Sequence, residues 1–185
     1  MSKQASRGHN YNMRIIISDS CCLIDLRKAV LLKAFLMLPY EIVIPNTLFE
    51  EELLRFSEQE KKALLDNGLK VLDLPGDSVR RAIKLEADFP ALSIHDCFAF
   101  ALAESIPNSI LLTGDGGLRT VATDHQIEVH GVLWAIDEIH KAATATVNEL
   151  ITALELFESD PTIFRLPSRD LKGLIRSYKS LVTEN

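Results

Sequence analysis

Short runs of β-branched apolar residues alternate along the chain with longer segments of helical periodicity, and this alternation restricts the fold more than any other feature. Each run is bounded by polar, glycine or proline residues, as buried strands are. The predicted strands are 14–18, 40–44, 69–74, 109–113 and 126–130. Because helices separate successive strands, the pattern predicts an α/β fold in which helices cover both faces of a parallel sheet.

The predicted elements divide the chain into three segments. Residues 1–12 show no periodicity, so we expect a disordered leader there. Residues 13–131 contain all the predicted strands and form the expected sandwich domain. Residues 132–185 have helical patterns interrupted by Pro161 and Pro167, which predicts a C-terminal helical extension packed on that domain.

The charge balance limits the partners of the chain. It has 20 Lys and Arg against 26 Asp and Glu, a formal net charge of −6. Proteins that bind polyanions by bulk neutralisation of phosphate carry a basic surplus. The balance therefore excludes a general nucleic-acid coat protein but not a local site that acts on nucleic acid.

Cysteine spacing and hydropathy exclude further classes. The 3 cysteines include no Cys-x-x-Cys pair, which argues against a disulfide framework and a zinc ribbon. The start of the chain has no signal-peptide pattern, and no apolar run approaches the roughly 20 residues that span a bilayer. We therefore expect a cytoplasmic protein with no membrane partner.

Acidic residues stand near the carboxyl ends of the predicted strands. Asp19 directly follows the first strand, and Asp115 stands two residues after the fourth. Three consecutive glutamates, 50–52, lie early in the helix after the second strand, and Asp96 lies in the first turn of a later helix. Ligands of an open parallel sheet bind outside the carboxyl ends of its strands, so we expect these acids to gather at one edge.

Each acid alone also has a purely structural interpretation. Asp19 and Asp115 can cap the helices that follow them, Ser93 with Asp96 fits a capping box, and the glutamates can favour a helix N-terminus by their charge. Taken together, however, converging carboxylates repel one another unless a cation lies between them. An all-oxygen cluster suits Mg²⁺ or Mn²⁺, and such a site supports phosphodiester hydrolysis.

At these acids the sequence resembles the PIN-domain nucleases. Four motifs carry the resemblance: Ile-Ile-Ile-Ser-Asp-Ser (15–20), Val-Ile-Pro-Asn-Thr-Leu-Phe-Glu-Glu-Glu-Leu (43–53), Leu-Ser-Ile-His-Asp-Cys-Phe-Ala-Phe-Ala-Leu-Ala (92–103) and Leu-Leu-Thr-Gly-Asp-Gly-Gly-Leu-Arg-Thr-Val-Ala (111–122). They cover about residues 13–130 and imply a PIN-like α/β/α sandwich with metal-dependent endonuclease activity, usually on RNA. Many small members of this family are VapC-type toxins, which implies an RNA substrate, an antitoxin protein as partner and a homodimer.

The resemblance also implies a set of site residues. It makes four acids both catalytic residues and ligands of Mg²⁺ or Mn²⁺: Asp19, Glu51, Asp96 and Asp115. Successive helical residues point about 100° apart, so only one glutamate can face the cluster well. Alignment on the preceding Leu-Phe pair favours Glu51, with Glu50 as the second choice.

Other polar residues are assigned supporting or structural roles. Ser20 and Thr113 match positions whose hydroxyls support the acid cluster in the family. Arg119 falls four residues after Asp115, so it either steers a scissile phosphate or pairs with that carboxylate. His95, adjacent to Asp96, is expected to point away from it as a surface or cap residue.

The C-terminal segment carries a basic stripe and one aromatic residue of interest. The stripe consists of Arg165, Arg169, Lys172, Arg176 and Lys179. Its spacing fits a solvated amphipathic helix, or else a face that contacts RNA or a partner. Trp134 is expected in the core.

Metal-dependent endoribonuclease activity is the leading hypothesis for function, and the resemblance makes a toxin role part of it. One alternative is a catalytically silent PIN-like binding or scaffold module. Another is a metal-dependent phosphatase, although the first motif lacks the Asp-x-Asp that an aspartyl nucleophile normally shows.

Overall fold

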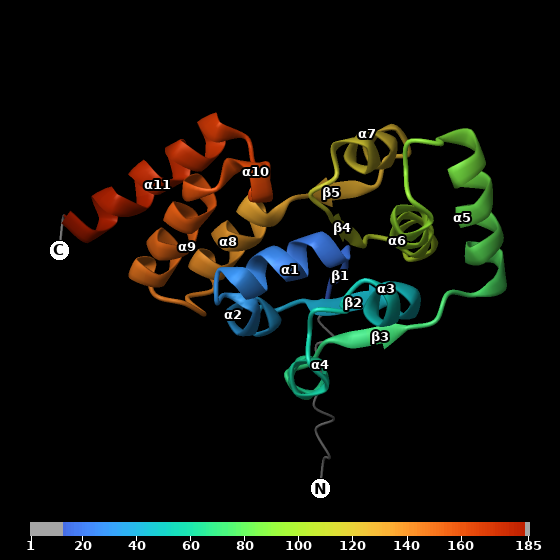
Figure 1. Ribbon diagram of the computed structural model, residues 1–185, viewed down its shortest axis with the longest axis horizontal. Helices are drawn as coiled ribbons and strands as arrows, with labels where there is room; N and C mark the ends of the chain where they lie inside the picture. The colour runs from blue at the N-terminus through green and yellow to red at the C-terminus, as the bar shows by residue number, and fades with distance from the viewer. Residues whose placement is uncertain (1–12, 184–185) are drawn as a thin grey trace, which may run out of the picture.

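The computed structural model describes residues 13–183, and the predicted leader 1–12 lies outside the described residues. The strands are β1 (Ile15–Ser18), β2 (Glu41–Pro45), β3 (Lys70–Leu72), β4 (Ile110–Leu112) and β5 (Glu128–His130). They form one sheet in the order β3-β2-β1-β4-β5, and every neighbouring pair is parallel (Figure 1). The predicted parallel α/β fold is confirmed.

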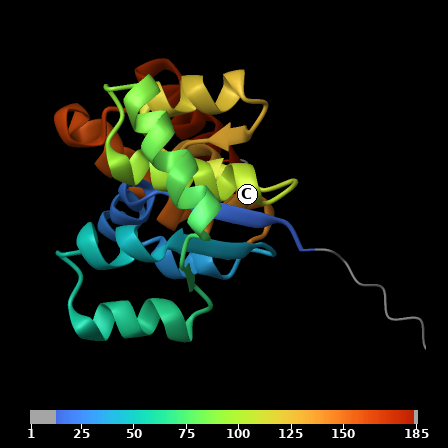
Figure 2. The same cartoon turned by 90° about the vertical axis from the view of Figure 1, so that its right-hand side faces the viewer.

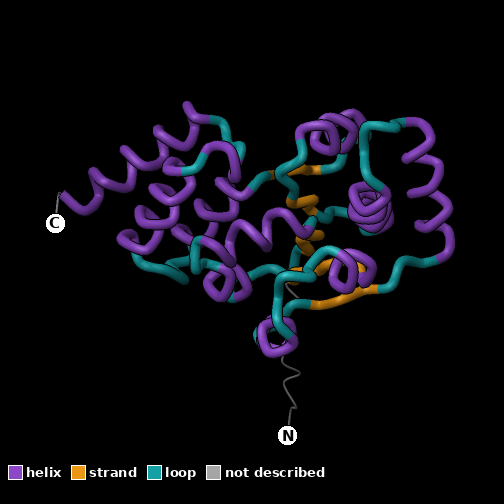
Figure 3. The backbone as a smooth tube through the Cα atoms, viewed as in Figure 1, coloured by secondary structure: helices purple, strands orange, loops and turns teal. Residues whose placement is uncertain are grey.

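Helices cover both faces of this sheet. On one side lie α3 (Asn46–Glu51), α5 (Gly76–Asp88) and α6 (Ile94–Ser105), and the side view in Figure 2 shows α5 and α6 in front of the strands. On the other side lie α1 (Ser20–Lys28), α2 (Leu32–Leu36) and α8 (Val132–Lys141). The elements α4 (Glu58–Asp66) and α7 (Gly116–Asp124) lie toward the two edges (Figure 3). Because both faces are covered, Ile16 and Ile17 on adjacent positions of β1 are both fully buried.

The C-terminal helices α9 (Val147–Ser159), α10 (Pro161–Phe164) and α11 (Ser168–Thr183) extend the layer that begins with α8. The inner faces of α9 and α11 pack together through buried side chains, among them Leu154, Phe157 and Ile175. Trp134 was expected in the core but is only half-buried, because it lies at the start of α8 between Tyr40 and His130. No helix within residues 13–183 is long and apolar enough to cross a membrane.

The helix after β2 is shorter than expected. The sequence pattern predicts a helix to about Ser57, whereas α3 ends at Glu51. Ser57 adopts an extended backbone conformation and caps α4 by a capping box with Glu60, so it cannot continue the earlier helix. Between the two helices, Leu53 and Phe56 are buried in the core. The early end of α3 affects the candidate site, because the three glutamates 50–52 lie at this end of the helix.

Candidate active site

The carboxyl ends of the two adjacent strands β1 and β4 bring two acids to one place. The backbone N–H of Asp19 donates to the carbonyl of Leu112 (2.9 Å), which joins the ends of these strands. The hydroxyl of Thr113 donates to Oδ2 of Asp19 (2.9 Å) and accepts the backbone N–H of Asp115 (3.1 Å). Thr113 therefore links the two acids at the sheet edge.

Asp19 is a hydrogen-bond acceptor in the site and not a helix cap. It occupies the N-cap position of α1, yet its side chain makes no capping bond. Its carboxylate also accepts from the Cys21 thiol (3.0 Å) and the Ser20 hydroxyl (3.3 Å). The residue is only 5% exposed, and no Lys or Arg within residues 13–183 forms an ion pair with it. A buried carboxylate without a cation is costly, so capping does not account for this residue.

Asp96 and Asp115 both cap helices, as their structural interpretation predicts. Oδ2 of Asp96 accepts from the backbone N–H (2.8 Å) and hydroxyl (2.7 Å) of Ser93, and Oδ1 of Asp115 accepts from the backbone N–H of Leu118 (2.7 Å). Each cap uses one carboxylate oxygen, and no donor in the described part of the chain binds the other. Capping therefore holds each side chain in place and leaves one oxygen for a ligand.

The acids also affect one another electrostatically. Burial raises the pKa of Asp96, the hydrogen bonds from Ser93 lower it, and the nearby carboxylates of Asp19 and Asp115 raise it again. The pKa of Asp96 therefore reflects a local excess of negative charge. A cation bound among these carboxylates would relieve their repulsion.

The three glutamates differ in where their side chains lie. The side chain of Glu51, the expected second acid, is 63% exposed, and its Oε2 lies 2.8 Å from Nε2 of His95. Glu50, the second choice, faces a lysine of α4 instead. Oε2 of Glu52 accepts a hydrogen bond from the Ser20 hydroxyl (2.5 Å), which also contacts Asp19. Glu52, and not Glu51, therefore faces the cluster.

The helical geometry of α3 explains this orientation. Leu48 and Phe49 are buried, and Glu52 follows them by four and three residues, so it lies on the same inward face. Burial raises the pKa of Glu52, the Ser20 hydrogen bond lowers it, and the Asp19 carboxylate raises it. Spacing from the two buried residues could have identified Glu52 in the sequence, had it been applied in place of motif alignment.

His95 is a site residue that the sequence did not indicate. The sequence predicts that His95 points away from Asp96, and no contact joins the two side chains in the described residues. The His95 ring instead reaches from α6 to the end of α3. Nδ1 lies 3.2 Å from Oε1 of Glu52, and Nε2 lies 2.8 Å from Oε2 of Glu51. This contact depends on how α3 and α6 pack, so no local pattern could have shown it. His95 holds Glu51 at the rim and contacts Glu52 inside.

Arg119 does not pair with Asp115. Its side chain forms no ion pair within residues 13–183. Its guanidinium lies against Gly131 at the start of α8, where a Cβ would stand 2.7 Å from Nη1. The structure therefore does not show the ion pair with Asp115 that was one of the two roles predicted for Arg119.

The donor set fits a hard divalent cation in its chemistry. Asp19, Glu52, Asp96 and Asp115 offer carboxylate oxygens, the ligands that Mg²⁺ and Mn²⁺ prefer. As they stand, no three His, Cys, Asp or Glu side chains among residues 13–183 are close enough to hold one ion together. Carboxylates without a cation repel one another, and a cation among them would remove this repulsion.

Comparison with known families agrees with this fold. A family model described as a PIN domain matches residues 15–179, so the chain belongs to the PIN-domain family, a nuclease superfamily. The match extends through most of α11, well beyond the motifs at 13–130. No curated protein matches the chain.

Asp25 on α1 makes the stability of the folded protein depend on pH. Burial raises the pKa of Asp25 to about 6, with Lys28 lowering it and Asp19 raising it. The pKa of Asp25 is higher in the folded than in the unfolded state, so protonation of this carboxyl stabilises the folded protein. This stabilisation is complete below about pH 3.9 and is lost as the pH rises through about 6.

Asp25→Asn, which stays neutral, is expected to increase the melting temperature at pH 7.5 and to leave it unchanged at pH 4. Discounted for solvent screening, the gain at pH 7.5 is about 1 kcal/mol, or about 2–4 °C. Thermal denaturation followed by circular dichroism at both pH values measures it. An equal increase at pH 4 would show that the gain does not come from the carboxylate charge.

Proposed function

We propose that this protein is a Mg²⁺- or Mn²⁺-dependent endoribonuclease that hydrolyses RNA phosphodiester bonds at the carboxyl ends of β1 and β4. The observation that carries the proposal is the buried carboxylate of Asp19, which neither caps a helix nor pairs with a cation in the described residues. Membership of the PIN-domain family supports the reaction class. A metal held by the site carboxylates would let an acidic chain act on an anionic substrate, because it would reduce the repulsion between carboxylates and phosphate.

Each site residue has a role in this proposal. Four acids hold the metal: Asp19, Glu52, Asp96 and Asp115. When bound there, the metal would activate a water and neutralise charge on the phosphate. Ser20 and Thr113 orient the carboxylate of Asp19 by hydrogen bonds, and Arg119, free of an internal ion pair, positions the scissile phosphate.

The proposal is tested by RNA cleavage with purified protein. Single-stranded RNA is expected to be cut in Mn²⁺ or Mg²⁺ and to stay intact in EDTA. Asp96→Asn is expected to lower the rate by about a hundredfold or more, because it removes a metal-binding charge. Asparagine can accept the same two hydrogen bonds from Ser93, so the cap of α6 is retained and the loss is attributable to the site.

Two results would contradict the nuclease proposal. Cleavage that is equal in EDTA and in Asp96→Asn would mean that a contaminating nuclease or another site is responsible. Absence of cleavage together with no change of melting temperature in Mn²⁺ would favour a scaffold module, since a bound ion stabilises the folded state by mass action.

The toxin role, an antitoxin partner and a homodimer are part of this proposal. PIN domains bind RNA and can pair with antitoxins, which supports the assignment at the level of the family. Expression of the wild-type chain in a bacterial host is expected to arrest growth, and Asp96→Asn is expected to relieve the arrest. Equal toxicity of the two chains would separate any growth effect from nuclease activity.

A further inference from the structure

A groove leads from the acid cluster along the C-terminal helices. Next to Asp115, a cleft of about 660 Å³ lies between the start of α7, the start of α8 and the loop from α10 to α11. A second hollow of about 570 Å³ continues along α11. Both are lined by Leu133, Trp134 and Asp170, so they are parts of one groove.

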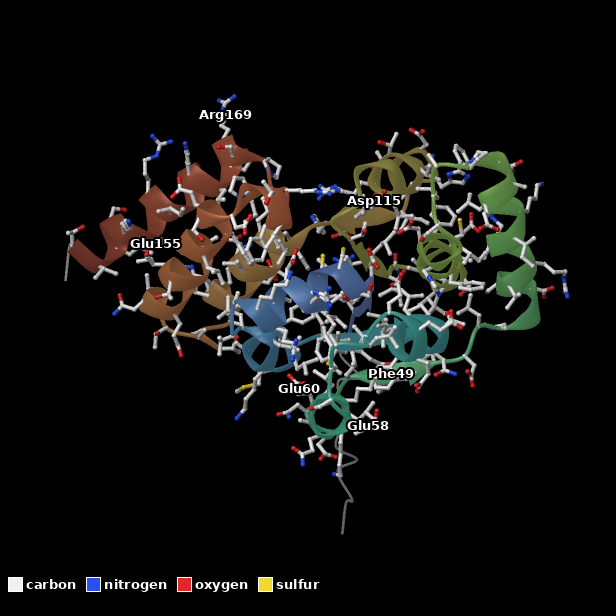
Figure 4. All side chains as sticks on the ribbon, viewed as in Figure 1. Phe49, Glu58, Glu60, Asp115, Glu155 and Arg169 are labelled. Carbon is white, nitrogen blue, oxygen red and sulfur yellow. The ribbon has the colours of Figure 1, made fainter. Side chains whose placement is uncertain are left out.

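Unpaired arginines line the whole groove. They are Arg119 and Arg165 in the first cleft and Arg169 and Arg176 in the second hollow. None of them forms an ion pair within residues 13–183, whereas the arginines elsewhere in that range do, except Arg55; Arg14 pairs with Glu128, for example, and Arg81 with Glu104. Figure 4 shows Arg169 pointing outward from the start of α11. Guanidinium groups that no internal acid neutralises are suited to bind phosphates.

The acids of the groove do not cancel this charge. Asp137 in the second hollow is already paired with Lys141 (2.8 Å). Asp170 lies in the first turn of α11, where the helix dipole stabilises a negative charge. Asp115 belongs to the proposed metal site. The arginines therefore remain available to an anionic ligand.

A stacked aromatic pair lines the first cleft. The rings of His130 and Trp134 lie 4.4 Å apart at an interplanar angle of 9°, and both residues are only half-buried. Aromatic rings beside a basic groove bind unpaired bases, which stack on them, while arginines bind the backbone. A double helix hides its bases, and an acidic peptide has none. The combination favours a single-stranded nucleic acid.

We propose that this groove binds the single-stranded RNA substrate on one side of the cleavage point, with the arginines contacting phosphates and the His130–Trp134 pair contacting a base. The inference rests on the proposed function, because it places this strand next to Asp115. It gives three residues of the basic stripe, Arg165, Arg169 and Arg176, a role as substrate contacts and makes the C-terminal helices part of the nuclease.

Fluorescence anisotropy of a labelled single-stranded RNA in EDTA tests binding without cleavage. The double variant Arg165→Gln/Arg169→Gln is expected to weaken binding by about tenfold or more and to reduce the slope of log K against log salt by about 1.4, at about 0.7 per phosphate contact. The control Lys33→Gln/Lys84→Gln removes the same charge from exposed positions outside the groove on α2 and α5, and it is expected to change affinity by less than about twofold. Melting curves verify that both variants are folded.

Three outcomes overturn the inference: unchanged RNA affinity in the groove variant, an unchanged salt slope, or equal weakening in the control. The first would also be found if the groove served an acidic protein segment. The binding test is independent of the nuclease proposal. RNA binding that depends on the groove arginines, without Mn²⁺-dependent cleavage, would support the RNA groove and contradict the nuclease. Normal cleavage and normal RNA affinity in the groove variant would support the nuclease and contradict the RNA groove.

Discussion

Asp19→Asn is expected to abolish metal-dependent cleavage, by about a thousandfold or more, and at the same time to stabilise the metal-free protein. The buried carboxylate of Asp19 lies beside other acids without a cation, so its charge destabilises the metal-free fold. Asparagine fits the same space. Its oxygen can accept from Thr113 and Cys21, and its amide can donate to the Ser20 hydroxyl, which itself donates to Glu52.

The two effects are measured separately by thermal denaturation. In EDTA, the variant is expected to melt about 3–6 °C above the wild type, which corresponds to about 1–2 kcal/mol. In Mn²⁺ at about a hundred times its Kd, the wild type is expected to gain about 2.7 kcal/mol, or about 5–10 °C, while the variant gains none. A variant that melts lower in EDTA and still responds to Mn²⁺ would mean that Asp19 has a structural role and is not a ligand.

Glu52→Gln is expected to reduce Mn²⁺-dependent cleavage by about a hundredfold, whereas Glu51→Gln is expected to change it by less than about threefold. The two residues are adjacent and chemically identical, so each variant is the matched control for the other. Glutamine at 52 can still accept from Ser20, and glutamine at 51 can still contact His95, so both variants keep the local contacts.

Cleavage rates under single-turnover conditions, with Mn²⁺ titrated, distinguish the two glutamates. The Glu52 variant is expected to need more Mn²⁺ for half-maximal rate, because it lacks one negative ligand. The opposite result, with activity lost only in the Glu51 variant, would restore the choice that motif alignment makes and would require α3 to rotate when metal binds.

Much of the fold could be predicted because its causes are local. Buried strands such as 14–18 and 109–113 are apolar on both faces, and the helices between them force a parallel sheet. The positions of Asp19 and Asp115 follow from the same pattern, since the carboxyl ends of adjacent parallel strands meet at one edge. The C-terminal helices were also evident from periodicity and from the two prolines.

Contacts between distant segments were decided only by the tertiary structure. Spacing from Leu48 and Phe49 points to Glu52, but its contact with Ser20 exists only because the end of α3 packs beside the start of α1. The contact of His95 with α3 and the cleft shared by Arg119 and Arg165 require the packing of helices far apart in sequence. Periodicity describes how each segment buries its own apolar face, but it carries no information on which side chains of two packed segments meet.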